Sequence, residues 1–171
     1  MNVVDVFKLI KDGYPELKAK ISKLRQLDEE SEQYKQVKSS LLAIMFNGTF
    51  NERNDNGLID HSGLCILDFD DYPDNKTMVE DKARFKAMSV VFMVFISPSN
   101  KGLKVVVKIP PSTKEEHKRR FKALKNYFDS EYFDTSSQNV SRVCFESFDP
   151  EAYLNEFCET FNGITEERGH V

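Results

Sequence analysis

The sequence lacks any long hydrophobic run. None of its apolar stretches approaches the roughly 18 residues of a membrane-spanning helix. Residues 1–5 are too polar for the start of a secretory signal peptide, so we expect a cytoplasmic protein without a membrane segment. Cysteine is also scarce: Cys65, Cys144 and Cys158 are scattered, without the spacing of metal ligands. Two of them stand inside apolar runs, which favours small buried side chains and fits a reducing compartment.

Several catalytic motifs are absent as well. The chain has no G-x-x-x-x-G-K-[ST] segment, which excludes a P-loop nucleotide site. It has no Ser-His-Asp or Cys-His arrangement, so we expect no dedicated side-chain nucleophile. His117 falls on the apolar stripe of a predicted helix and is expected to be buried. His61 either faces a cleft or makes a structural hydrogen bond.

What is present is the composition of one globular domain. The chain has 171 residues, of which 40% are hydrophobic and 12% aromatic. The net charge is −4, but the charges are divided along the chain. Between residues 101 and 125 there are nine Lys or Arg and two acids, whereas acids gather around residues 68–81 and in the C-terminal segment. This division suggests an acidic metal-binding centre beside a phosphate-binding rim.

Hydrophobic periodicity predicts an α+β fold, with a mixed or antiparallel sheet and helices packed on it. Helices are expected at 3–11, within 16–40, at 78–87 and after the capping box at 112–115. Strands are expected at 42–50, 64–70, 89–96, 101–109 and 142–146. We expect a single domain in three parts: an N-terminal helical segment (1–40) packed on the core, a catalytic core (41–162) and a flexible tail (163–171).

Asp68 and Asp70 end an apolar run that predicts a buried strand. Because side chains alternate along a strand, these two carboxylates point to the same side. Ionised acids at such a place are costly unless a cation lies between them, and hard oxygen ligands suit Mg²⁺ or Mn²⁺. The alternative is an acid pair that faces water or caps a turn.

The connection between two predicted strands, residues 97–104, has the composition of an anion-binding loop. Its small residues let backbone N–H groups approach a phosphate, the hydroxyls of Ser97 and Ser99 donate, and Lys101 and Lys104 add positive charge. The alternative is a plain hairpin loop with a surface lysine.

Two charged residues farther along extend the candidate site. Asp134 follows Phe133 at another expected strand end and is a third carboxylate of the same kind. Arg142 opens the predicted strand 142–146, where it would share one face with Cys144 and Glu146 and bind phosphate. The alternative is a surface salt bridge between Arg142 and Glu146.

In this order, the Asp-x-Asp strand end, the Ser-x-x-Gly-x-basic loop, the later aspartate and the later arginine resemble the three motifs of the archaeo-eukaryotic primase (primase-polymerase) superfamily. Short segments between Leu42 and Asn155 resemble its VirE N-terminal-like branch, the small N-terminal domains of phage, plasmid and mobile-element replication proteins. These segments are Phe46-Asn47-Gly48-Thr49-Phe50, His61-Ser62-Gly63, Ser97-Pro98-Ser99, Gly102-Leu103-Lys104, Ser141-Arg142-Val143-Cys144-Phe145 and Phe148-Asp149-Pro150. The resemblance implies an RNA-recognition-like primase core.

The resemblance also implies a function: a DNA-dependent nucleotidyltransferase that makes or extends a strand on a single-stranded DNA template. Asp68, Asp70 and Asp134 would hold two Mg²⁺ or Mn²⁺ ions. The incoming nucleoside triphosphate would be bound by Ser97, Ser99, Lys101, Gly102, Lys104 and Arg142, and nucleic acid by Lys108, Lys118, Arg119 and Lys122. Many members of the superfamily carry His where this chain has Lys104, which keeps the charge but loses the imidazole geometry. In the closer branch lysine is usual at this position.

Two expectations about partners remain open. Relatives of this kind are usually joined to a helicase or another C-terminal part, so a helicase part or partner is expected. The alternative function is a non-catalytic replication module that binds single-stranded nucleic acid through the basic stretch 101–125.

Overall fold

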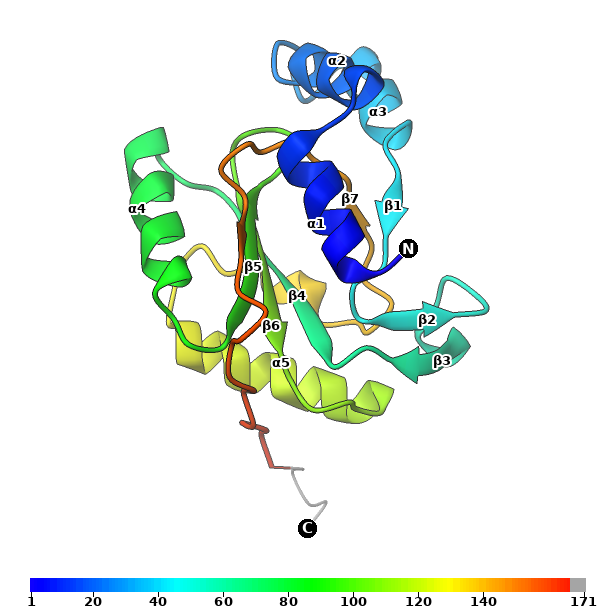
Figure 1. The fold of residues 1–171 in the computed structure, drawn as a ribbon, viewed down its shortest axis with the longest axis vertical. Coiled ribbons are helices and arrows are strands. Elements are labelled where there is room, and N and C mark those ends of the chain that lie inside the picture. Colours follow the sequence, from blue (N-terminus) through cyan, green and yellow to red (C-terminus); the bar gives the residue numbers. More distant parts are fainter. Residues whose placement is uncertain (167–171) are drawn as a thin grey trace.

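A four-stranded antiparallel sheet forms the centre of the structure, a computed structural model that describes residues 1–166 (Figure 1). The strands lie in the order β4-β6-β5-β8, and their bounds are β4 Leu64–Phe69, β5 Val91–Ile96, β6 Leu103–Lys108 and β8 Tyr153–Leu154. Helix α4 (Asn75–Lys86) connects β4 to β5, and helix α5 (Lys114–Phe128) follows β6. Beyond α5, Phe133 forms an antiparallel bridge with Phe69, on the free edge of β4.

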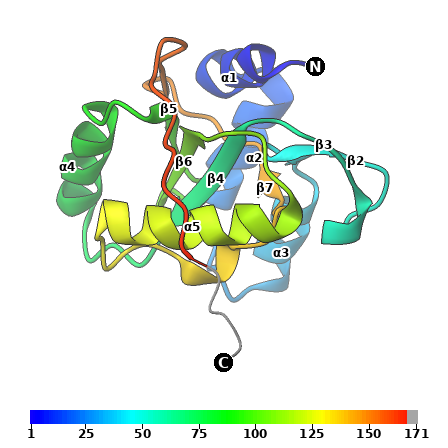
Figure 2. The same ribbon diagram turned by 90° about the horizontal axis from the view of Figure 1, so that it is seen from below.

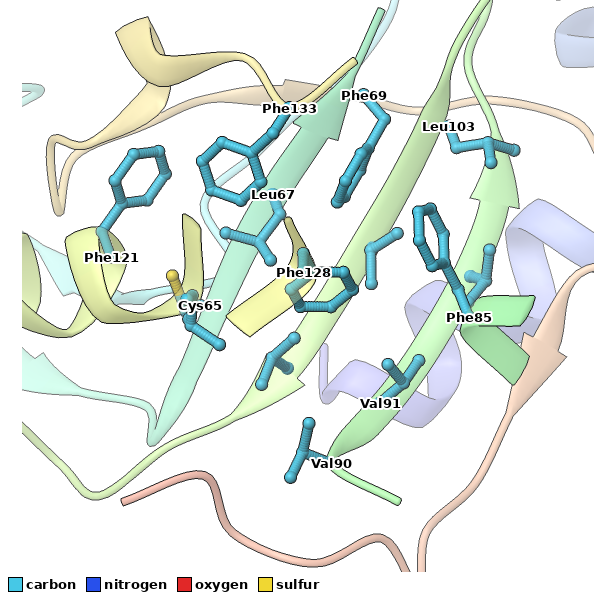
Figure 3. Packing of buried hydrophobic residues seen from close by; sticks show 14 of the residues in the cluster. Cys65, Leu67, Phe69, Phe85, Val90, Val91, Leu103, Phe121, Phe128 and Phe133 are labelled. Atoms are coloured by element: carbon cyan, nitrogen blue, oxygen red, sulfur yellow. The ribbon is translucent and has the colours of Figure 1, made fainter. Parts of the chain in front are cut away.

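Helices α4 and α5 cover one face of this sheet. Cys65, Leu67 and Phe69 point to this face because side chains alternate along β4. They pack against Phe85 of α4 and Phe128 of α5, and the rings of Phe69 and Phe85 lie 4.5 Å apart (Figure 3). This apolar layer fixes the position of the strand that carries Asp68.

Helix α1 (Val3–Asp12) covers the opposite face, and Figure 2 shows α1 and α5 on the two sides of the sheet. Val6 and Ile10 of α1 pack there with Ile66 of β4 and Val106 of β6. Asp68 follows Ile66 by two residues and therefore points to the same side as α1.

The N-terminal region and two small sheets complete the structure. Helices α2 (Pro15–Leu24) and α3 (Glu32–Ser39) pack together through Leu17, Ile21, Leu24, Tyr34 and Leu41. Strand β1 (Ala43–Ile44) pairs with β7 (Cys144–Phe145), and β2 (Gly48–Phe50) pairs with β3 (Leu58–His61), both antiparallel.

The α+β class with antiparallel pairing is confirmed, but some predicted elements were wrong in detail. The segment 16–40 contains two helices with a turn between them. The predicted strand 42–50 is divided between two sheets. It is interrupted at Asn47, whose buried side chain donates to the carbonyl of Val140 (3.0 Å) and accepts from the amide of Ile66 (2.9 Å).

The predicted strand 142–146 is shortened to Cys144–Phe145, and its facing was wrong. Cys144 and Glu146 are buried, whereas Phe145 is partly exposed. The reason is that Glu146 turns inward and accepts hydrogen bonds from the hydroxyl of Tyr14 (2.9 Å) and the amide of Leu42 (3.0 Å). The expected alternative, an ion pair between Arg142 and Glu146, does not form.

Of the predicted flexible tail 163–171, residues 167–171 lie outside the described residues. Within the described part, Thr165 is held by α5, because its amide donates to the carbonyl of Arg119 and its carbonyl accepts from the Arg119 guanidinium (2.6 Å). Among residues 1–166, no helix combines the length and apolar character needed to cross a membrane.

Candidate functional site

The three candidate carboxylates come together at the end of β4. The amide of Asp134 donates to the carbonyl of Asp68 (2.9 Å), and the amide of Asp70 donates to the carbonyl of Tyr132 (2.9 Å). With the bridge between Phe69 and Phe133, these bonds attach the segment 132–134 to β4 as a short extra strand. This pairing brings Asp134 beside Asp68, although the two residues are far apart in the sequence.

Asp68 is almost fully buried, with 3% of its surface exposed, and both of its carboxylate oxygens have cationic partners. Lys104 lies opposite Asp68 in the register of β4 and β6, and its Nζ donates to Oδ1 (2.8 Å). The Arg142 guanidinium donates to Oδ2 through Nη2 (2.7 Å) and Nε (3.2 Å), and the Ser137 hydroxyl donates to the same oxygen (2.9 Å). Burial alone would raise the pKa of Asp68, but Lys104 and Arg142 outweigh it and hold the pKa below its ordinary value.

Asp134 is linked to this cluster but is more exposed. Its Oδ2 accepts from the Ser137 hydroxyl (3.2 Å) and lies 3.9 Å from Nη2 of Arg142. Its Oδ1 caps the short 3₁₀ turn Thr135–Ser137 by accepting from the amide (2.9 Å) and hydroxyl (2.7 Å) of Ser136. Partial burial raises the pKa of Asp134, but the Ser136 and Ser137 bonds outweigh it and lower the pKa.

Asp70 differs from the other two carboxylates. Within residues 1–166 its side chain has no hydrogen-bond donor or ion-pair partner. Burial raises its pKa, and the neighbouring charges of Asp68 and Asp134 add to this although Lys104 opposes it. An incompletely neutralised acid beside two other acids is a favourable place for an added cation.

The loop 97–102 packs directly against this acid. The Gly102 amide donates to the Ser97 hydroxyl (3.1 Å), which lies 3.1 Å from the Ser99 hydroxyl. A Cβ atom on Gly102 would lie 2.7 Å from Oδ1 of Asp70, so only glycine fits there. Lys101 at the loop's tip pairs with Glu29 (2.8 Å). The structure therefore brings the predicted phosphate loop and the predicted acids to one place.

A pocket of about 620 Å³ opens at this place. Its lining includes Asp70, Asp134 and the aromatic rings of Tyr72 and Tyr132, whose centroids are 4.3 Å apart. It also includes Ser99 and Lys101 together with residues of the N-terminal helical segment. The volume is within the range of small-molecule sites.

The expected Mg²⁺ or Mn²⁺ ions need carboxylate oxygen atoms that are not already bound to other cations. Asp70 and Asp134 present hard oxygen atoms to the pocket, which suits Mg²⁺ or Mn²⁺. Asp68 is already neutralised by Lys104 and Arg142. In the described part of the chain, no group of three or more His, Cys, Asp or Glu side chains is arranged as a metal site. The residues thus fit a cation at Asp70 and Asp134, with Asp68 engaged elsewhere.

The predicted nucleic-acid residues do not gather at this pocket. Lys108 is exposed at the other end of β6 from Lys104. Lys118, Arg119 and Lys122 lie on α5, which covers the opposite face of the sheet from Asp68. Nζ of Lys118 lies 3.7 Å from Oδ2 of Asp55, so this lysine forms an ion pair away from the pocket.

Comparison with known proteins gives one match. The family model described as BT4734-like, N-terminal domain, matches residues 36–154. The chain belongs to this family. No curated protein matches the chain, and no solved structure does.

The part of the chain that matches the BT4734-like N-terminal domain contains all three carboxylates, the phosphate loop and Arg142. The matched part begins at residue 36, after Glu29 and Tyr34, although both of these residues line the pocket. Sequence reasoning missed these two residues and Lys38, because the charged helical segment that holds them carries no motif. Only its contact with the loop in space connects it to the site.

Other sequence predictions concern buried residues. The two cysteines of the apolar runs, Cys65 and Cys144, are buried, as is His117, which confirms their expected placement; Cys158 is buried as well. His61 makes a hydrogen bond with His117 (3.0 Å), which is the structural alternative that we considered.

Proposed function

We propose that this domain is a metal-dependent nucleotidyltransferase of the primase-polymerase type, which makes or extends a strand on a single-stranded DNA template. The observation that carries the proposal is the convergence of Asp70 and Asp134 with Ser99 and Lys101 of the loop at one pocket, with Asp68 joined to Asp134 through the Ser137 hydroxyl. These groups come from three separate parts of the chain, and no requirement of the apolar core explains why they meet.

The topology supports the same proposal. The order β4-α4-β5-β6-α5 followed by the strand-like segment 132–134 is a β-α-β-β-α-β arrangement, with both helices on one face. We propose that this is the RNA-recognition-like core of the archaeo-eukaryotic primase superfamily, near its VirE N-terminal-like branch. Asp68 and Asp70 then lie at the end of the first strand of that core.

The residues of the pocket have complementary tasks in this proposal. The Ser99 hydroxyl and Lys101 bind the phosphates of the nucleoside triphosphate, and the bond from the Gly102 amide to the Ser97 hydroxyl holds the loop in shape behind them. A divalent cation bound at Asp70 and Asp134 would lower the pKa of the attacking 3′-hydroxyl and balance the charge of the leaving pyrophosphate. Lys104 and Arg142 fix the carboxylate of Asp68 and keep positive charge close to the phosphates. Phosphoryl transfer depends on such positioning and charge balance and needs no side-chain nucleophile.

A strand-synthesis assay tests the proposal. Purified protein is incubated with Mn²⁺ or Mg²⁺, a single-stranded DNA template with and without primer, and labelled ribo- or deoxynucleoside triphosphates. Asp70→Asn should reduce incorporation by about a hundredfold or more, because the cation's contribution is worth several kcal/mol. Asp60→Asn is the matched control, since Asp60 is exposed on β3 and away from the pocket lining. Unchanged synthesis in Asp70→Asn would reject the site.

One observation favours a second function, a non-catalytic module that binds single-stranded nucleic acid. Asp68 is neutralised by Lys104 and Arg142, which leaves less negative charge to repel a phosphate backbone. Absence of synthesis with either metal, combined with strand binding that weakens steeply with salt, would select this function over the enzyme.

A further inference from the structure

The N-terminal helical segment contributes Glu29, Tyr34 and Lys38 to the lining of the pocket, and it holds the phosphate loop 97–102 in place. The Arg25 guanidinium donates to the carbonyls of Pro98 (3.2 Å) and Ser97 (3.4 Å). Its Nη2 also donates to the carbonyl of Phe148 (3.1 Å), so Arg25 joins three parts of the chain. These bonds fix the loop relative to helices α2 and α3.

Two further contacts attach α3 to the same loop. Tyr34, buried at the start of α3, lies close enough to the Ser99 hydroxyl for that hydroxyl to oppose the rise that burial causes in the pKa of Tyr34. Glu29, in the turn between α2 and α3, forms the ion pair with Lys101. Both residues line the pocket, so these contacts hold α3 at the same pocket that Asp70 and Asp134 line.

Lys38 lies one helical turn beyond Tyr34 and also lines the pocket. Its Nζ is 5.8 Å from the centre of the Tyr34 ring, and within residues 1–166 it has no acidic ion-pair partner. The other lysine of the lining, Lys101, is neutralised by Glu29. Lys38 is therefore the pocket lysine whose charge is available to an incoming anion.

We propose that Lys38 is a phosphate-binding residue, which α3 contributes to hold the polyphosphate of a nucleoside triphosphate in the pocket. This inference rests on the proposed function. The charges of the lining set the orientation: Asp70 and Asp134 repel phosphate, whereas Lys38 and Lys101 attract it. Glu29 competes with phosphate for Lys101, so it weakens nucleotide binding.

The experiment measures the affinity of the full chain for a non-hydrolysable nucleoside triphosphate with Mg²⁺, by titration calorimetry. Lys38→Met should weaken binding by about tenfold or more, the usual effect of losing one charged hydrogen bond. Lys35→Met is the matched control, because Lys35 is on the same helix but pairs with Glu32 (3.6 Å) and does not line the pocket. The control should bind like the wild type.

Glu29→Gln should change the triphosphate affinity in the opposite direction. By releasing Lys101, it should strengthen triphosphate binding by roughly two- to fivefold, an effect that added salt reduces. The corresponding nucleoside without phosphates should bind all four proteins equally, because the proposed contact is with the polyphosphate.

The failures of the two proposals are distinguishable. Wild-type affinity in Lys38→Met, or equal weakening in Lys38→Met and Lys35→Met, would overturn the role of Lys38 and leave the proposed enzyme intact. Weaker binding in Glu29→Gln would overturn the competition argument. Absence of triphosphate binding by the wild type would instead overturn the proposed function itself.

Discussion

Acid should destabilise this protein through the buried His117 and its half-buried neighbour His61. The amide of Gly63 donates to Nδ1 of His61 (3.0 Å), so His61 carries its proton on Nε2 and donates it to Nδ1 of His117 (3.0 Å). His117 then carries its proton on Nε2, which lies 3.7 Å from the sulfur of Cys65 and 3.4 Å from Nδ2 of Asn47, an amide nitrogen that donates to the carbonyl of Val140. Both rings are neutral in this arrangement, and a second proton on either would leave two donors facing each other.

The size of the effect follows from the pKa of His117. Burial, followed by the effect of a positive charge on His61, lowers this pKa from 6.5 to about 3, although Asp55 opposes the shift. Below pH 6.5 the unfolded chain binds a proton that the folded protein does not, so stability falls as the pH falls, until about pH 3. Each pH unit in this window costs about 1.4 kcal/mol, and the change from pH 7 to pH 5 costs about 2 kcal/mol.

Urea unfolding at pH 7 and pH 5 measures this cost in the wild type and in His117→Gln. The difference in the free energy of unfolding between the two pH values should be about 2 kcal/mol smaller in the variant. Contributions from carboxylates occur in both proteins and cancel. An equal loss in both proteins, or an NMR titration of His117 near pH 6.5 in the folded state, would refute the reasoning.

Two further predictions concern the buried ion pair between Lys82 and Asp149 and the close approach of Gly102 to Asp70. Lys82→Met should destabilise the protein by about 3–5 kcal/mol in urea unfolding, because it leaves the buried carboxylate of Asp149 without its cation at 2.7 Å. Lys76→Met on the same helix, whose ion pair is exposed, should change stability by less than about 0.5 kcal/mol, and equal effects of the two would contradict the argument. Gly102→Ala should reduce triphosphate affinity in calorimetry by displacing the loop from Asp70, since its Cβ would lie 2.7 Å from the carboxylate. Wild-type affinity in Gly102→Ala would show that the loop does not need its close approach.

The sequence was informative where a local pattern is enough to determine a structure. The predicted capping box at 112–115 and the apolar spacing of Phe121, Leu124 and Phe128 predicted helix α5, although the box was wrong by one residue: Thr113 is the N-cap and Glu116 its partner, so the helix begins at Lys114. The apolar run before Asp68 predicted a buried strand for the same reason. In both cases the pattern depends on neighbours in sequence.

The sequence was less informative where distant segments meet. Arg142 was expected on a strand, on the same face as Glu146 and available to phosphate, but it turns to Asp68, 74 residues away in sequence. The buried ion pair between Lys82 and Asp149 joins residues 67 apart, and neither has a signal in its own segment. Such pairings depend on which strands and loops are adjacent, and spacing along one segment does not report this.

The pocket residues of the N-terminal helical segment could not be predicted from local sequence patterns either. Residues 16–40 have the charge of a solvated helix, and their predicted role was to pack on the core. Tyr34 and Lys38 line the pocket because Arg25 and Glu29 bind the loop at 97–101. Only the folded chain brings these residues to the acids.

A crystal soaked with Mn²⁺ and a non-hydrolysable nucleoside triphosphate is the decisive test of the proposed metal and nucleotide site. We expect an anomalous manganese peak in contact with Asp70 and Asp134, and phosphates bound by Ser99 and Lys101. A pocket that stays empty of manganese and nucleotide at concentrations that saturate polymerase sites, or a nucleotide bound far from Asp70, would contradict it.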